Sequence, residues 1–200
     1  MYALCCGATS ALVLSFPKID LQLEINGLHH GLLDQLMPFI TWGGDGLFAI
    51  LLSIILWLFV HQRAGVMLFT TYLVTALLAQ AGKHMFFPDA MRPFYYLKEN
   101  PAFHKIPEFL YYEYHSFPSG HTTTAFAMAT TLSLVFQCRV WGQIGLLALA
   151  CLVGFSRTYL SQHFLGDVVV GSLLGTLGSL GILYLWPTKW YPNETPWYKR

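Results

Sequence analysis

The stretch SRTYLSQHFLGD, residues 156–167, joins two strongly apolar runs of the chain, GLLALACLVGF before it and VVVGSLLGTLGSLGILYLW after it. Within this stretch an arginine, a histidine and an aspartate occur together, at Arg157, His163 and Asp167. Charged groups in or near a bilayer are costly, and they tend to persist where they line a polar cavity or take part in chemistry. The pattern predicts two membrane helices that meet at a polar functional site.

The composition is that of a membrane protein. Of the 200 residues, 55% are hydrophobic and only 10% are charged, whereas soluble domains carry roughly 25% charged residues. The net charge is +1 and the basic residues are scattered along the chain, so we expect no nucleic-acid partner. No linker, low-complexity segment or internal repeat divides the sequence, which indicates a single integral membrane domain over residues 1–200.

Hydropathy predicts an all-α fold, a polytopic membrane helical bundle of about six transmembrane helices. A spanning helix needs about 20 apolar residues, or somewhat fewer where the bilayer is thin. Six apolar stretches approach that length: 2–16, 46–60, 65–82, 120–137, 141–156 and 166–186.

Two segments need a separate interpretation. Residues 2–16 lack a positively charged start and a clear cleavage site, so we expect a retained helix and not a signal peptide. Residues 17–45 place apolar side chains at helical spacing with polar ones between them, which favours a helix lying in the membrane interface.

In the last apolar stretch, the spacing of Gly171, Gly175 and Gly178 predicts a close approach to a neighbouring helix.

Several lysines and arginines outside the connection 83–118 indicate the orientation in the membrane. They fall in alternate connections and near the end of the chain, at Arg63, Arg139, Lys189, Lys199 and Arg200. The positive-inside rule puts these residues on the cytoplasmic side. The remaining connections, including 83–118, then face outward. We therefore expect a bacterial inner (plasma) membrane protein whose polar site faces the periplasm.

The predicted outer ends of the helices collect polar residues that hydropathy does not explain. Separate segments bring three cations, two imidazoles and one carboxylate to one membrane face: Lys83, Arg92, Arg157, His121, His163 and Asp167. A purely structural distribution would not concentrate them in this way. The concentration indicates one site built from several helix ends.

The cations and one helix start have the chemistry of a phosphate site. Arg92 and Arg157 offer planar forks that pair with two phosphate oxygens at once, and Lys83 adds a point charge. In the run Pro118-Ser119-Gly120-His121, proline stands just before a helix start, and we expect the backbone N–H groups of Ser119 and Gly120 to point at an anion.

The histidines and the aspartate have the chemistry of nucleophilic attack. His163 and Asp167 are four residues apart at the start of a helix, so they share a face, and the carboxylate can hold the proton of one ring nitrogen while the other attacks. His163 is therefore the candidate nucleophile. His121, on another helix, is placed to give a proton to the departing alkoxide as a general acid.

This order of residues resembles the type 2 phosphatidic acid phosphatase (PAP2) superfamily, which combines a Lys…Arg-Pro element, a Pro-Ser-Gly-His motif and a Ser-Arg-x5-His-x3-Asp motif. The second and third motifs stand at 118–121 and 156–167 with the family's spacing. In the Lys…Arg-Pro element, eight residues separate Lys83 from Arg92, which is a longer gap than the family usually has. The resemblance covers about 80–186. It implies a six-helix membrane fold and a metal-free phosphohydrolase with a covalent phosphohistidine on His163.

Cofactors and metals are not expected. No histidine pair has the spacing of a metal site, and the four cysteines lie in or beside apolar segments, where a thiol acts as a small packing group.

Three function classes follow from these residues. The leading hypothesis is a lipid phosphate or pyrophosphate phosphatase, with membrane lipids around it and a lipid phosphate as substrate. The alternatives are a phosphotransferase that uses the same phosphohistidine, and a non-catalytic membrane binding or transport protein. The lipid stays open among undecaprenyl pyrophosphate, phosphatidic acid, phosphatidylglycerol phosphate and a lipid A phosphate. The oligomeric state stays open as well.

Overall fold

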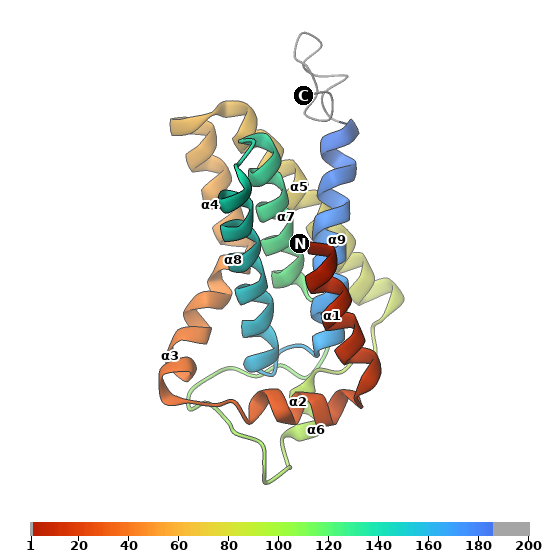
Figure 1. Cartoon of the computed structure of the whole chain (residues 1–200). Coiled ribbons are helices and arrows are strands. Elements are labelled where there is room, and N and C mark those ends of the chain that lie inside the picture. The colour runs from red at the N-terminus through yellow and green to blue at the C-terminus, as the bar shows by residue number, and fades with distance from the viewer. Residues whose placement is uncertain (1, 186–200) are drawn as a thin grey trace.

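The structure, a computed structural model, describes residues 2–185, and over that range it consists of helices and loops without a β-strand (Figure 1). The helices are α1 Tyr2–Ser15, α2 Lys18–Asn26, α3 Gly31–Ile40, η1 Thr41–Gly44, α4 Gly46–Ile55, η2 Leu56–Val60, α5 Gln62–Ala81, η3 Gly82–Phe86, α6 Pro93–Leu97, α7 Gly120–Val135, α8 Val140–Tyr159 and α9 Leu165–Leu185. Each of the six apolar stretches of the sequence forms helix.

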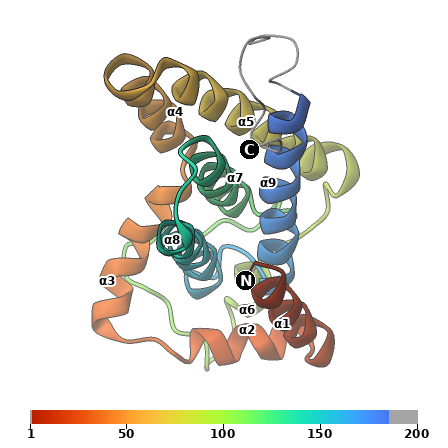
Figure 2. The ribbon, with the colours of Figure 1, turned by 45° about the horizontal axis from the view of Figure 1, so that its top comes forward.

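Helix α7 is the centre of the bundle and packs against α5, α8 and α9 (Figures 1 and 2). Its small and apolar side chains make this possible, because Ala125 and Phe126 form a buried cluster with Ala150 and Val153 of α8. Helix α1 leans on the outside of α9. The start of α7 is therefore enclosed by the ends of several other helices.

The glycines of α9 allow the close packing that the sequence predicts. A Cβ atom on Gly171 would lie 2.6 Å from the carbonyl oxygen of Ser119 in front of α7, and one on Gly178 would lie 2.8 Å from Thr75 Cγ2 of α5. Real side chains do not approach so closely. Because these glycines have no side chain, α9 can pack closely against both α5 and α7.

The membrane prediction is confirmed, with a lower count of clear spans. Three helical segments among residues 2–185 are long and apolar enough to cross a bilayer: Gln62–Phe86, Val140–Tyr159 and Leu165–Leu185. Two bent helix pairs raise the number to as many as five. Helix α7 has only 16 residues, about four fewer than a typical span needs.

Residues 17–45 do not form one helix in the membrane interface. Helix α2 is bent by 114° from α1 and lies across one end of the bundle (Figure 1), as the interfacial pattern predicts. Helix α3, in contrast, continues through η1 into α4 with a bend of 58°. The Asp45 side chain accepts a hydrogen bond of 2.8 Å from the N–H of Leu47 and so starts α4 as its N-cap. The second half of this segment therefore belongs to a bent helix pair, in which the cap at Asp45 starts the second helix.

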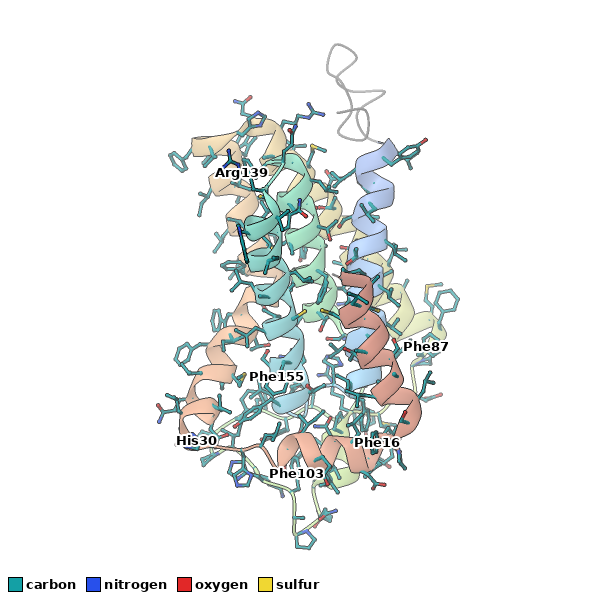
Figure 3. The ribbon with its side chains drawn as sticks, in the orientation of Figure 1. Phe16, His30, Phe87, Phe103, Arg139 and Phe155 are labelled. Atoms are coloured by element: carbon teal, nitrogen blue, oxygen red, sulfur yellow. The ribbon has the colours of Figure 1, made fainter. Side chains whose placement is uncertain are left out.

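The two ends of the bundle differ in chemistry. Arg139 lies at one end, and His30 and Phe103 lie at the other, together with α2, α6 and the long loop (Figure 3). The expected cytoplasmic residues Lys189, Lys199 and Arg200 lie outside the described residues. Arg139 is therefore at the far end from the segments that carry the predicted site.

Gly175→Ala should destabilise the bundle by about 1–3 kcal/mol, because overpacking of a filled interface has that cost. The new methyl group would meet the carbonyl oxygen of Thr123 and would lie 3.0 Å from the N–H nitrogen of Ala127, both backbone atoms of α7. Gly181→Ala on the same helix is the matched control, since among the described residues no atom outside its own helix turn lies within 4 Å of its Cβ position. Thermal unfolding of the purified proteins in detergent measures the difference. Equal melting temperatures for the two variants would contradict the packing.

Candidate active site

The ends of separate segments bring the predicted site residues together at one end of the bundle. Lys83 lies where α5 passes into η3, and His121 begins α7. Arg157 lies in the last turn of α8, His163 in the short turn that follows, and Asp167 in the first turn of α9. The exposed fractions of Lys83, Arg157, His163 and Asp167 are 9%, 6%, 1% and 7%. Burial of so many ionisable groups is costly and is typical of a functional site.

Lys83 faces the start of α7 in spite of its long spacing from Arg92. Its Nζ lies 4.0 Å from the position that a Cβ on Gly120 would take. The wide π-helical turn of η3, closed by a hydrogen bond from the N–H of Phe87 to the carbonyl of Gly82, takes up part of the extra length.

Two other lysines, in the long connection between η3 and α7, are engaged elsewhere. Lys98 pairs with Glu113 at 2.8 Å, and Lys105 lies over the ring of Phe94. Lys83 is thus the lysine that the fold brings to the start of α7.

Arg92 has a different environment from the one expected. Its Nε donates to the carbonyl oxygen of Tyr114 at 2.8 Å, and its Nη1 donates to the Oε1 and the carbonyl oxygen of Gln162 at 2.9 and 3.1 Å. These bonds tie the loop between η3 and α7 to the turn that carries His163. The third nitrogen, Nη2, lies 3.5 Å from the carbonyl oxygen of His115, so only part of the guanidinium's donor capacity is left for an anion.

Arg157 is held by a residue that the sequence did not single out. Its Nη1 donates to Thr41 Oγ1 at 2.6 Å. Its Nε is buried and has no hydrogen-bond partner among the described residues. A buried guanidinium with unused donors suits an anionic ligand, because each unpaired donor is costly until it is satisfied.

The start of α7 differs in part from the expectation. The N–H of Ser119 donates to the carbonyl oxygen of Asp167 at 3.1 Å, so it is engaged and does not point at an anion. The hydroxyl of Ser119 forms a bond of 2.9 Å with that of Thr122. The first N–H groups of a helix have no acceptor within the helix, so those of Gly120 and His121 are the candidates for contact with an anion.

His163 and Asp167 are adjacent, as the four-residue spacing predicts, but they are not hydrogen-bonded. His163 Nδ1 lies 3.5 Å from Asp167 Oδ2, and no hydrogen-bond partner for it is found within residues 2–185. The same Oδ2 accepts from Ser116 Oγ at 2.5 Å and from the N–H of Phe164 at 3.0 Å. These two bonds fix the carboxylate close to the ring. The gap between the carboxylate and the ring nitrogen is compatible with a catalytic pair, because catalytic hydrogen bonds are often long without substrate.

The electrostatic environment keeps His163 uncharged. Burial lowers the pKa of His163 well below its ordinary value, and the charges of Arg92, Arg157 and Lys83 act in the same direction. The imidazole therefore stays neutral as the pH falls below its usual titration range. A neutral ring has the free lone pair that a nucleophile needs.

Sequence reasoning missed the residues that orient the predicted site. Ser116 lies two residues before the Pro-Ser-Gly-His run, and its backbone N–H also donates to the carbonyl of Ala90 at 2.8 Å. Gln162 sits inside the opening stretch beside His163. Their proximity to the motifs was a usable signal. Thr41 had none, because it lies 116 residues from Arg157.

Metal ligands do not gather among the described residues. Within residues 2–185, no group of three or more histidine, cysteine, aspartate or glutamate side chains is placed to hold a metal ion. The four cysteines are unpaired thiols.

The fold and the site together define an integral membrane helical bundle with a buried, cationic, histidine-containing site at one end. The family model of the PAP2 superfamily matches residues 47–191. An undecaprenyl-diphosphatase of Sulfolobus acidocaldarius is 30% identical over 160 residues, which make up 80% of this chain and 73% of that protein. The chain belongs to the PAP2 superfamily.

Solved structures support the same fold. The crystal structure of Aquifex aeolicus LpxE aligns with a TM-score of 0.72 at 30% identity, over 85% of this chain and 97% of that one. A PAP2-type phosphatidylglycerolphosphate phosphatase from Bacillus subtilis aligns with a TM-score of 0.66 at 23% identity, over 94% of this chain and 95% of that one, and shows the fold alone. Other matches are partial: the chain spans 43% of an Escherichia coli relative and 15% of the lipid A 1-phosphatase of Porphyromonas gingivalis.

Ser116→Ala should lower the rate of phosphate release roughly tenfold or more, since a hydrogen bond to a charged group contributes about 1.5–3 kcal/mol. The loss should fall on kcat, because the Asp167 carboxylate loses the 2.5 Å bond that fixes it. Ser15→Ala, which removes an exposed hydroxyl on α1, is the matched control. A Ser116→Ala protein with wild-type kcat would show that this bond does not orient Asp167.

Proposed function

We propose that this protein is an integral membrane lipid phosphatase that releases phosphate from a lipid phosphate or pyrophosphate through a phosphohistidine on His163. The observation that carries the proposal is the convergence of three cations, two histidines and a carboxylate at one buried end of the bundle. The undecaprenyl-diphosphatase and lipid A 1-phosphatase named above are relatives, which supports a phosphate ester or anhydride of a lipid as substrate.

The phosphate binds first. The positive charges of Lys83, Arg92 and Arg157 offset its negative charge, and the N–H groups of Gly120 and His121 donate hydrogen bonds to its oxygens. Removing water from such a site strengthens each of these interactions.

Attack follows from the ring nitrogen that faces away from the carboxylate. His163 Nδ1 is the atom nearest Asp167, so Nε2 forms the bond to phosphorus while the bond from phosphorus to the lipid oxygen breaks. His121 protonates the departing oxygen. Water then attacks the phosphohistidine, with His121 taking its proton, and phosphate leaves.

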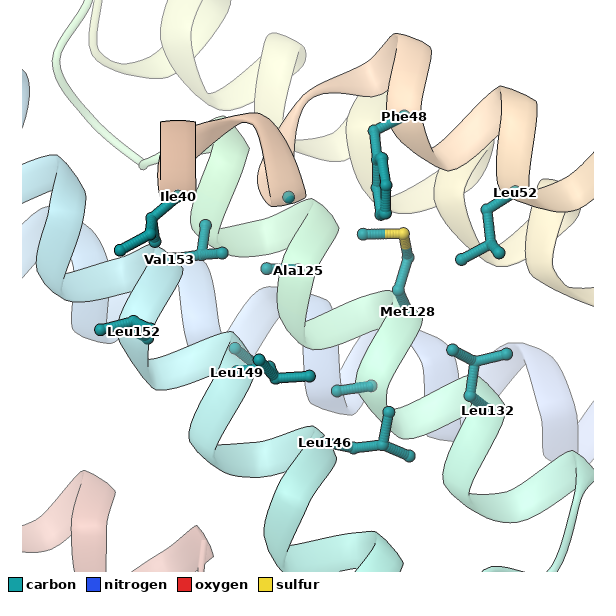
Figure 4. Close-up of a pocket in the computed structure, with 13 residues that line it drawn as sticks. Ile40, Phe48, Leu52, Ala125, Met128, Leu132, Leu146, Leu149, Leu152 and Val153 are labelled. Carbon is teal, nitrogen blue, oxygen red and sulfur yellow. The ribbon is translucent and has the colours of Figure 1, made fainter. Parts of the chain in front are cut away.

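An apolar cavity close to the site fits the lipid part of the substrate. It has a volume of about 320 Å³ and lies between α4, α7 and α8, with Ile40, Phe48, Met128, Leu149 and Val153 among its lining residues (Figure 4). Ala125 of its wall is one turn from His121, and Val153 is one turn from Arg157. A hydrocarbon tail in this cavity would leave its phosphate at the cationic site.

The chemical test is to trap the intermediate. Wild-type protein, mixed with lipid phosphate labelled in its phosphate group and quenched at alkaline pH, should carry the label on His163 and release free phosphate. His163→Ala should lose label and turnover together, whereas His84→Ala, at an exposed position, should keep both. Undecaprenyl pyrophosphate, phosphatidic acid, phosphatidylglycerol phosphate and a lipid A phosphate form the substrate panel. Label on another residue would overturn the proposal, and transfer of phosphate to a second lipid would identify a phosphotransferase.

The membrane side of the site is a separate proposal. Arg139 lies at the end of the bundle opposite to the site (Figure 3), and Arg63 lies in the first turn of α5. The positive-inside rule therefore supports a site that faces the outside of a bacterial inner membrane. Single cysteines at the exposed positions Glu99 and Gln143, in a cysteine-free background, should differ toward an impermeant thiol reagent on intact cells. Glu99→Cys should react and Gln143→Cys should not. The reverse result would put the chemistry in the cytoplasm.

A further inference from the structure

The segment from Thr41 to Asp45 lies against the active site although it belongs to none of the three motifs. It comprises η1 and the N-cap of α4, and it packs against both α7 and α8. It also lies outside residues 47–191, the part of the chain that the family model matches. Its contacts assign it a role in the reaction.

A close approach of backbones fixes this segment against the proposed general acid. A Cβ atom on Gly44 would lie 2.5 Å from the carbonyl oxygen of His121 and 2.7 Å from Val153 Cγ1. Only glycine fits there. The position of the next residue, Asp45, relative to His121 is therefore set by packing.

The two ends of the segment contact two different site residues. Thr41 Oγ1 accepts the 2.6 Å hydrogen bond from Arg157. Asp45 Oδ1 accepts from the N–H of Leu47, which fixes the plane of the carboxylate. The other oxygen, Oδ2, lies 3.8 Å from His121 Nε2.

The charges around His121 explain why a carboxylate is needed there. Burial lowers the pKa of His121, and the charges of Arg157 of α8, Lys83 of η3 and Arg92 of the loop before α6 act in the same direction. The charge of His121 in turn acts on His163. Three cations oppose a further positive charge. A general acid must nevertheless carry its proton until the leaving oxygen takes it, and an adjacent carboxylate favours the protonated ring.

We propose that Asp45 is the positioning residue of the general acid, accepting the Nε2 proton of His121 so that Nδ1–H faces the leaving oxygen. This inference rests on the proposed function. The contact must shorten by roughly 0.6 Å or more to become a hydrogen bond. As the bond from phosphorus to oxygen breaks, the Nδ1 proton passes to that oxygen, and water returns a proton to Nδ1 in the second step. Each catalytic imidazole then has its own carboxylate, Asp167 for His163 and Asp45 for His121.

The experiment varies the leaving group. Wild type and Asp45→Asn are compared on an alkyl phosphate, whose alkoxide needs protonation, and on an aryl phosphate with the same chain length, whose phenolate does not. Since general acid catalysis contributes about 10²–10⁴-fold, we expect kcat on the alkyl ester to fall about 100-fold and kcat on the aryl ester to fall less than about threefold. Asparagine is also a good N-cap, so α4 keeps its start. Asp20→Asn, at an exposed site on α2, is the matched control and should leave both rates unchanged.

The pH profile gives a second readout. Without the carboxylate, the charged form of His121 loses a favourable partner, so the alkaline limb of kcat on the alkyl ester should move to lower pH. Phosphohistidine should still form from the aryl ester in Asp45→Asn.

Two results would overturn the inference. These are an equal loss on both esters, which a merely structural role predicts, and wild-type kinetics on the alkyl ester. A wild-type protein that forms no phosphohistidine from either ester would instead overturn the proposed function, and this inference with it.

Discussion

One backbone hydrogen bond joins the two halves of the site, from the N–H of Ser119 to the carbonyl oxygen of Asp167 at 3.1 Å. It connects the residue before α7 with the first turn of α9, and so sets the distance between the proposed acid and the proposed nucleophile. The bond is possible because Gly171, one turn further along α9, has no side chain to collide with Ser119. A fold in which α9 stood farther from α7 would separate His121 from His163.

The second constraint is electrostatic. Lys83, Arg92 and Arg157 share a buried region with the carboxylate of Asp167, so positive charge dominates. Isolated buried charges are costly, and the cost falls when a phosphate dianion pairs with them. The same excess of cations, with burial, keeps the pKa of His163 low. The phosphate affinity and the reactive nucleophile that we propose would therefore have one physical origin.

The connection between η3 and α7 and the segment 41–45 hold the residues of this centre in place from two sides. Arg92 ties the loop to the turn of His163 through Gln162, and Ser116 ties it to Asp167. On the other side, Thr41 holds Arg157. Residues outside the motifs thus orient those within them.

The sequence by itself determined that this is a helical membrane protein, and it determined the types of residue at the site. Composition and motif spacing can be read directly along the chain. Hydropathy predicted the apolar helices, and the four-residue spacing predicted that His163 and Asp167 would be neighbours. Only the tertiary structure decided that residues 17–45 divide into α2, which lies across one end of the bundle, and the first part of a bent helix pair, and that the N–H of Ser119 is already engaged. It alone brought Thr41 to Arg157, across 116 residues, and Asp45 to His121. Such contacts depend on how helices cross, and pairwise packing of distant segments leaves no periodic trace in the chain.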